Sequence, residues 1–318
     1  MAVVGVDLGG TNITVALVDA SGRVLDRKRP KTPRKGPEAV VRSIAKAIGK
    51  LDESPDAVGV GVPGPVRDGV VETAPNLRGW DGPVPVRDLL LELLDVPVVV
   101  DNDANVGVLG EWVAGAGRGA KFLLGVWLGT GVGGGLVLDG RPYTGAFGGA
   151  GELGHVVVQH GGERCGCGRR GCLEAYAGRA AMEARVEAQV AAGRRTLLHE
   201  LRARYEKKRV TSGIWAEALA EGDPVATEVF DAAVDALGAA IGGAVNLLDL
   251  DAVVVGGGVA EKMGAPLADR LAAAVRPWLL VPDAPRRFAI AALGDDAGVI
   301  GAAMHARAHL LEPVDVDH

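Results

Sequence analysis

The sequence predicts an α/β fold, because short apolar runs alternate with helical patterns along the chain. The runs at 57–62 and 96–100 are continuously apolar, which is typical of strands buried in a parallel sheet. Between residues 37 and 50, the residues Val40, Ile44 and Ile48 repeat with the period of a helix. A repeated glycine-rich segment is the third observation, and it indicates that the fold is built twice.

The repeat pairs DLGGTNITVALVD (7–19) with WLGTGVGGGLVLD (127–139), without a gap. Leu8 falls on Leu128 and Gly9 on Gly129. Each copy is predicted as a strand, a glycine-rich turn and a second strand. Two such copies predict a duplicated, two-lobed fold, and a chance likeness between two glycine-rich hairpins is the alternative.

Further elements follow from the same patterns. Asp223 and Pro224 are expected to begin a long helix that runs to Leu248, because Asp caps helices and Pro suits the first helical position. The charged, Ala-rich region 176–222 is predicted to be helical. Additional strands are expected at 3–7, 13–18, 122–128, 252–255 and 288–292.

Composition excludes several classes of function. The chain has 318 residues and a net charge of -6, so it presents no basic field for DNA or RNA. It shows no basic, apolar leader and no run of about 18 apolar residues. We therefore expect a cytoplasmic protein with no nucleic-acid and no membrane partner.

The glycine-rich turns suit phosphate binding, because only glycine lets backbone N–H groups approach a phosphate without a Cβ clash. Side-chain donors are available from Thr11, Asn12 and Thr130, and Asp7 precedes the first turn, where it would hold Mg²⁺ through water. The remaining expected phosphate contacts are Gly9, Gly10, Gly129 and Gly131.

Two matches to the dinucleotide fingerprint G-x-G-x-x-G, at 59–64 and 129–134, fail because no helix follows either. No P-loop pattern occurs in the sequence. The run VVVGGGVAE (253–261) differs, because a strand leads through Gly256, Gly257 and Gly258 into a helix-compatible segment. This turn either passes under a nucleotide or is a tight loop without a ligand.

All three cysteines, Cys165, Cys167 and Cys172, lie within eight residues of one another, and His155 lies ten residues upstream. Three thiolates and an imidazole form a standard tetrahedral zinc set. Because four protein ligands close the shell, the zinc is predicted to be structural. Free thiols are the alternative, and His160 is a rival for the fourth ligand.

A candidate catalytic carboxylate follows the buried strand that ends near residue 100. Asp101, Asn102, Asp103 and Asn105 stand at its carboxyl end, where side chains of an α/β sheet reach a ligand. A carboxylate there would accept a proton from a sugar hydroxyl. An Asx-rich helix start is the equal alternative, since Asp and Asn cap helices.

Taken together, these motifs resemble the ROK family of repressors, open reading frames and sugar kinases, over nearly the whole chain. The matching segments are DLGGTN (7–12), NDAN (102–105), LGTGVGGG (128–135), and GELGH (151–155) with CGCGRRGCLE (165–174). The resemblance implies an actin-like, ribonuclease-H-like fold with two lobes around a cleft and a structural zinc loop. It also implies a smaller lobe of residues 1–116 and 296–318, and a larger lobe of residues 117–295.

The resemblance further implies a kinase that uses ATP and Mg²⁺ to phosphorylate the 6-hydroxyl of a hexose, glucose first. Asp103 would be the general base, and Gly256–Gly258 would lie near the adenosine. The resemblance favours His155 over His160 as the fourth zinc ligand. His155 would bind zinc through one ring nitrogen and offer the other to the sugar. The other expected sugar contacts are Asn102, Glu152, Glu174, Gly64 and Asn76.

Several alternatives remain open at this point. N-acetylmannosamine, N-acetylglucosamine or fructose would replace glucose if the loops around the sugar differ in shape. Polyphosphate is an alternative to ATP as the phosphoryl donor. Outside the enzymes, the alternative is a protein that binds sugar as a sensor and has no catalytic activity. The resemblance also implies a homodimer or homotetramer. A repressor is not expected, because the first motif begins at residue 7.

Overall fold

The structure is a computed structural model that describes residues 2–74 and 77–311. The chain divides into two compact units. The described residues of Met1–Lys121, Gly135–Gly151 and Ala292–His318 form the first unit, and Phe122–Gly134 with Glu152–Ala291 form the second.

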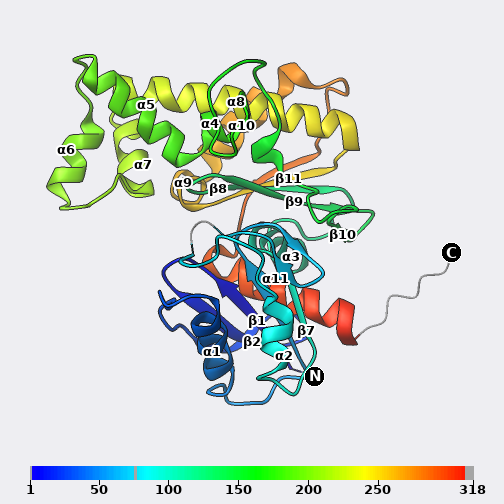
Figure 1. Ribbon diagram of the computed structural model, residues 1–318. Coiled ribbons are helices and arrows are strands. Elements are labelled where there is room, and N and C mark those ends of the chain that lie inside the picture. The colour runs from blue at the N-terminus through cyan, green and yellow to red at the C-terminus, as the bar shows by residue number, and fades with distance from the viewer. Residues whose placement is uncertain (1, 75–76, 312–318) are drawn as a thin grey trace. The chain divides into compact units, whose positions relative to one another are not determined.

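The sheet of the first unit has five strands in the order β3-β2-β1-β4-β7 (Figure 1). Its first three strands are antiparallel, whereas β4 and β7 run parallel to β1. The bounds are β1 Val3–Leu8, β2 Ile13–Val18, β3 Val24–Lys28, β4 Ala57–Val62 and β7 Val98–Asn102. After β4 in the sequence, β5 Val66–Arg67 and β6 Val70–Val71 form a separate two-stranded antiparallel ribbon.

A second sheet repeats this arrangement in the order β10-β9-β8-β11-β12. Here β9 and β10 are antiparallel, and β11 is parallel to both β8 and β12. The bounds are β8 Leu123–Leu128, β9 Val132–Leu138, β10 Arg141–Tyr143, β11 Ala252–Gly256 and β12 Arg287–Ile290. The turns after β1 and β8 occupy matching places in the two sheets, which confirms the predicted duplication.

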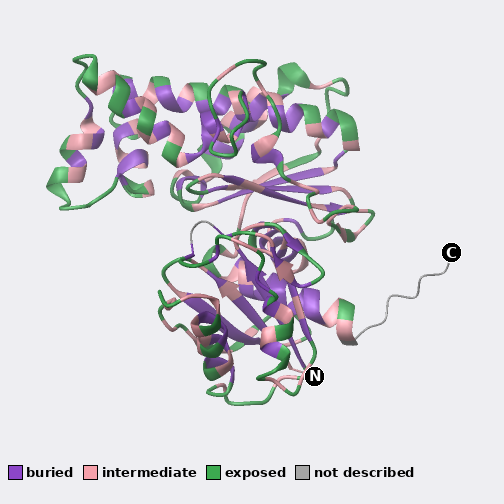
Figure 2. Cartoon of the chain, in the orientation of Figure 1, coloured by how far each residue is buried: buried purple, intermediate pink, exposed green. Residues whose placement is uncertain are grey.

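Helices cover both faces of the first sheet, so its strands β1, β2 and β4 are almost fully buried (Figure 2). One face packs on α1 Pro37–Ile48 and α2 Val86–Leu91. The other packs on α11 Ala297–Ala306, which lies against α3 Asp103–Ala114. Two short turns flank α11, namely η3 Gly294–Asp296 and the π-helical turn η4 Arg307–Leu311.

The second unit is rich in helices, as the composition of its central region predicts. The long α8 packs against α10, α4 and α5. The bounds are η1 Leu153–His155, α4 Glu174–Ala177, α5 Arg179–Ala191, α6 Leu197–Arg204, α7 Ser212–Ala220, α8 Pro224–Leu248, α9 Gly258–Met263, α10 Ala265–Val275 and η2 Arg276–Trp278.

The start of α8 agrees with its prediction, because the Asp223 carboxylate accepts from the Ala226 N–H at 2.6 Å and Pro224 opens the helix. Among the described residues, α8 alone is long and apolar enough to meet the criteria for a membrane span. Half of its apolar window is buried inside the structure, and the core helix of a soluble protein meets the same criteria. Its length therefore is weak evidence for a membrane.

Two strands, β7 and β12, have a boundary that differs from the predicted one by two residues. The strand β7 begins at Val98 rather than at residue 96, because Pro97 has no N–H to donate, and it continues to Asn102 because pairing with β4 continues. The strand β12 ends at Ile290 rather than at residue 292. The N–H groups of Ala292 and Leu293 instead donate to the buried carboxylate of Glu111.

Backbone contact between α11 and its neighbours fixes the first unit. A Cβ added to Gly5 of β1 would lie 1.8 Å from the Val299 carbonyl oxygen. One added to Gly59 of β4 would lie 1.8 Å from the Ala302 carbonyl oxygen. Real Cβ atoms never approach so closely, so α11 lies directly on the sheet only because these residues are glycine.

We therefore predict that Gly59→Ala lowers the free energy of unfolding by about 3 kcal/mol, because the added methyl group must push α11 from the sheet. Thermal denaturation measures this loss. Gly82→Ala is the matched control, since a Cβ there meets no atom within 4 Å. Equal melting temperatures for the two variants would contradict the packing described here.

Candidate functional site

The turn between β1 and β2 presents exposed backbone, as a phosphate site requires. Gly10 and Thr11 are exposed at its tip. The Gly9 N–H donates to the Asn12 carbonyl at 3.0 Å, and the Gly9 carbonyl accepts from the Thr32 hydroxyl at 2.6 Å. The turn is therefore held at both polar groups of Gly9, while its tip stays open.

Asp7 lies at the end of β1, just before this turn. Burial first, and then the negative charge of Asp295, raise the pKa of the Asp7 carboxyl to about 6, and Arg29 partly offsets this rise. A carboxylate that lacks a close cation in this way is suited to hold Mg²⁺, which prefers oxygen ligands. Its surroundings therefore fit the predicted magnesium role.

The predicted catalytic segment forms the junction between β7 and α3. Asn102 caps α3, because its side-chain oxygen accepts from the N–H groups of Ala104 and Asn105 at 2.9 and 3.3 Å. The Asn102 amide also donates to the Gly64 carbonyl at 3.0 Å, so these two expected sugar contacts lie together. The helix-cap interpretation is therefore correct for Asn102, and the catalytic interpretation concerns its neighbour Asp103.

That neighbour, Asp103, is the first residue of α3 and is exposed. Its carboxylate accepts from the Ala104 N–H at 2.8 Å. Asp103 is therefore a fixed, accessible carboxylate, as a general base must be.

Asp101 supports this junction from inside the unit. Its carboxylate accepts from the Asn102 N–H at 2.6 Å and from the Asn105 side chain at 3.0 Å. His305 of α11 lies 3.7 Å from the same carboxylate, and burial lowers the pKa of His305 to about 4. The imidazole is therefore neutral at pH 7.

In the second unit, the turn after β8 is tied to the start of α4. The Glu174 carboxylate accepts from the Val132 N–H at 3.0 Å, and a Cβ on Gly131 would lie 2.0 Å from it. Thr130 accepts from the Arg179 guanidinium at 3.2 Å. Gly129, Thr130, Gly131 and Glu174 thus form one local cluster.

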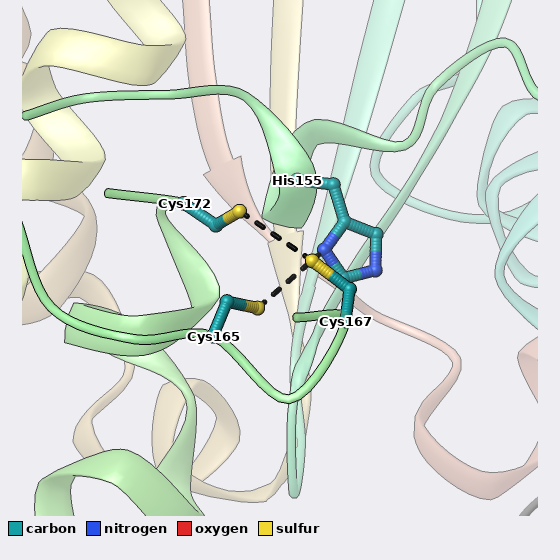
Figure 3. Close-up of side chains that lie close together, drawn as sticks. All are labelled: His155, Cys165, Cys167 and Cys172. Atoms are coloured by element: carbon teal, nitrogen blue, oxygen red, sulfur yellow. Dashed lines mark hydrogen bonds between the residues drawn. The ribbon is translucent and has the colours of Figure 1, made fainter. Parts of the chain in front are cut away.

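The expected zinc ligands also converge, as Figure 3 shows. The ligand atoms of His155, Cys165, Cys167 and Cys172 all lie within 4.8 Å of one another. The sulfurs of Cys167 and Cys172 are 3.7 Å apart, and the Cys165 sulfur lies 3.8 Å from His155 Nδ1. Ligands of a tetrahedral Zn²⁺ are about 3.5–3.8 Å apart, so the set fits zinc.

The electrostatics of the cluster favour the thiolate at Cys167 and oppose it at Cys165. Donation from Arg169 lowers the pKa of Cys167 to about 6, whereas burial raises the pKa of Cys165 to about 12. A bound dication would offset that cost of burial, because zinc binds the deprotonated thiol. Cys165 Sγ also lies 3.7 Å from Glu174 Oε1, which joins the metal cluster to the turn after β8.

The remaining predicted site residues are Glu152, Gly256–Gly258 and Asn76. Glu152 is exposed at the start of η1. Gly256–Gly258 join β11 to α9, as the predicted strand-to-helix turn requires, and a Cβ on Gly257 would lie 2.3 Å from the Leu128 carbonyl. Asn76 lies outside the described residues.

Sequence reasoning missed two residues that support the turns, Thr32 and Arg179. Thr32 is 23 positions from Gly9, and no local pattern links them. The signal for Arg179 was weak, since it only follows the cysteine-rich segment at the start of a helix. The contacts of Thr32 with Gly9 and of Arg179 with Thr130 join residues that are distant in the sequence and meet only in the folded chain.

Comparison with known proteins supplies independent findings. The family model described as ROK family matches residues 3–309. A glucokinase from Thermotoga maritima is 35% identical over 95% of this chain and 96% of its own length. An N-acetyl-D-glucosamine kinase from Citrobacter koseri is 33% identical over 94% and 97%.

A solved structure is similar over nearly the whole chain. It is a ROK family glucokinase from Streptomyces griseus in complex with glucose and AMPPNP. The two chains superpose with a TM-score of 0.81 at 34% identity, covering 97% of this chain and 100% of the other.

We predict that the purified protein carries about one zinc ion per chain and that Cys172→Ser loses it, because this buried sulfur is one of four ligands. Elemental analysis and thermal denaturation measure the loss of metal and of stability. His160→Ala is the control and should keep its zinc, since the exposed His160 lies outside the cluster. Wild-type protein without zinc would refute the assignment.

Proposed function

Since the chain belongs to the ROK family, we propose that it is an ATP-dependent sugar kinase that phosphorylates the 6-hydroxyl of glucose. The observation that carries the chemistry is Asp103, an exposed carboxylate fixed at the first position of α3. It follows β7, which runs parallel to β4 and β1, at the carboxyl ends of these parallel strands, where ligands of α/β sheets bind.

In the proposed reaction, the 6-hydroxyl oxygen of the sugar attacks the γ-phosphorus of ATP, and Asp103 takes the hydroxyl proton. The bond from the γ-phosphorus to its bridging oxygen breaks, and ADP leaves with the electron pair. The backbone N–H groups of the exposed Gly10 and Thr11 would bind phosphate oxygens in the first unit. In the second unit, Gly129–Gly131 would bind further phosphate oxygens, and Gly256–Gly258 would lie near the adenosine.

Mg²⁺ bound near Asp7 would neutralise charge on the triphosphate. Zn²⁺ held by the three cysteines and His155 would keep that imidazole in place. Because Nδ1 of His155 faces the sulfurs, its Nε2 remains for a sugar hydroxyl. Glu152, Glu174, Asn102, Gly64 and Asn76 complete the proposed sugar contacts.

A kinase for N-acetylglucosamine, N-acetylmannosamine or fructose is the alternative within the same chemistry. The similarity to an N-acetyl-D-glucosamine kinase, at 33% identity, is close to the similarity to glucokinases. The proposed sugar contacts recognise hydroxyls that many hexoses share. A sugar sensor is disfavoured, because a protein that only senses sugar needs neither Asp103 nor the phosphate turns.

We predict that Asp103→Asn lowers kcat by about 10²–10⁴-fold, because asparagine accepts the same N–H from Ala104 yet takes no proton. Glucose affinity, measured by calorimetry, should change by less than about threefold, since this step acts in the transition state. Asp88→Asn, on the exposed surface of α2, serves as the control with normal kcat. Near-normal turnover in Asp103→Asn would sink the base assignment.

We place the protein in the cytoplasm, where a cluster of three reduced thiols persists. We further propose that it assembles as a homodimer or homotetramer. The second unit supports this, because Trp278, Leu280 and Val281 are exposed beside the end of α8, where Leu247 is also exposed.

Light scattering at micromolar concentration should therefore give the mass of two or four chains, and Leu280→Asp should reduce it toward one chain. The solvent-exposed Leu93→Asp, in the first unit, should leave the mass unchanged. A monomeric wild-type protein would contradict the proposed assembly.

A further inference from the structure

The turn between β1 and β2 has a second wall, formed by the segment that follows β3. The Ile13 N–H donates to the Pro30 carbonyl, and the Thr32 N–H donates to the Thr11 carbonyl, both at 2.9 Å. Asn12 and Lys31 stand directly opposite each other in an antiparallel bridge. The β2–β3 ladder thus continues past β3 as far as the exposed turn.

This pairing decides where the Lys31 side chain points. Residues directly opposite in an antiparallel pair lie on the same face, with Cβ atoms about 4.5–5.5 Å apart. Lys31 therefore shares the face of Asn12, the last residue of the turn. It is exposed, and among residues 2–74 and 77–311 no ion pair involves it. A lysine ammonium is a compact charge with three donors, which suits phosphate oxygens.

Thr32, the next residue, acts on the other side of the turn through its 2.6 Å hydrogen bond to the Gly9 carbonyl. The peptide bond between Gly9 and Gly10 is planar and trans, so its carbonyl and N–H point in opposite directions. Because the Thr32 hydroxyl holds the Gly9 carbonyl, it directs the Gly10 N–H away from the 30–32 segment. Gly10 is exposed, so this N–H is free for a ligand.

We propose that Lys31 and Thr32 complete the phosphate site of the first unit. Lys31 binds the phosphate chain of the donor nucleotide on the face that it shares with Asn12. Thr32 is a positioning residue that directs the Gly10 N–H toward that chain. This inference rests on the proposed kinase function and adds two residues from outside the glycine-rich motif.

Substitution of Lys31 tests the first half. Lys31→Met should raise the KM for ATP by at least about tenfold, because a hydrogen bond to a charged group contributes about 1.5–3 kcal/mol. The KM for glucose and kcat should stay within about twofold, since the contact is uniform binding to the nucleotide. Lys31→Arg should retain most of the affinity. Lys50→Met, an equal loss of charge after α1, should leave every constant unchanged.

Substitution of Thr32 tests the second half. Thr32→Val keeps the shape of the side chain and removes its hydroxyl, so kcat/KM for ATP should fall about tenfold. Thr32→Ser restores the hydroxyl and should recover most of this loss. If Thr32 had only a structural role, Thr32→Val would lower thermal stability, and the KM for ATP and the KM for glucose would change alike.

Calorimetric titration with AMPPNP separates failure of this inference from failure of the proposed function. Wild type that binds AMPPNP and Lys31→Met that binds it at least about tenfold more weakly support the site. Equal affinities, or loss of glucose and AMPPNP binding alike in Thr32→Val, overturn this inference alone. Wild type that binds no AMPPNP overturns the proposed function and this inference with it.

Discussion

The first unit depends on the direct contact of α11 with the backbone of its sheet and of α3. Gly298 and Gly301 belong to α11 itself. A Cβ on Gly298 would lie 3.0 Å from the Asp7 carboxyl carbon, and one on Gly301 would lie 1.6 Å from the Val106 carbonyl. The helix therefore touches both the strand that carries Asp7 and the helix that begins with Asp103. Interiors packed this closely have little room to move, so the two carboxylates share one rigid support.

The fold was largely predictable because its periodic elements are long and its glycines gather in turns. The repeat of 7–19 at 127–139 revealed the duplication, and Asp223 with Pro224 located the start of α8. The end of β12 was not predictable, because it depends on N–H groups of Ala292 and Leu293 that turn to Glu111 in another part of the chain. Contacts between distant residues leave no periodic signal.

The same distinction applies to the site. Cysteine spacing is local, so the three cysteine ligands could be predicted, whereas the choice of His155 over His160 came from the family resemblance. The structure brings His155 and the three cysteines together. For Asn102, sequence alone could not separate a helix cap from a ligand contact, because one residue type suits both, and the structure shows the cap. Thr32 could not have been found, since its partner Gly9 comes close only when β3 pairs with β2.

The two units divide the proposed chemistry between two copies of one hairpin. The copy in the first unit leads from Asp7 into an exposed turn, while the copy in the second unit is joined to the metal cluster through Glu174. Sugar recognition in the second unit would thus depend on a metal that takes no part in the reaction. The proposed sugar contacts, by contrast, bind hydroxyls that many hexoses share.

ATP-dependent release of ADP across a panel of sugars tests the central claim most directly. The panel contains glucose, mannose, fructose, N-acetylglucosamine and N-acetylmannosamine. The account predicts that glucose has the highest kcat/KM, by about tenfold or more over the acetamido sugars. A higher kcat/KM for an acetamido sugar would contradict the assignment of glucose, and no ADP release with any sugar would contradict the proposed kinase function.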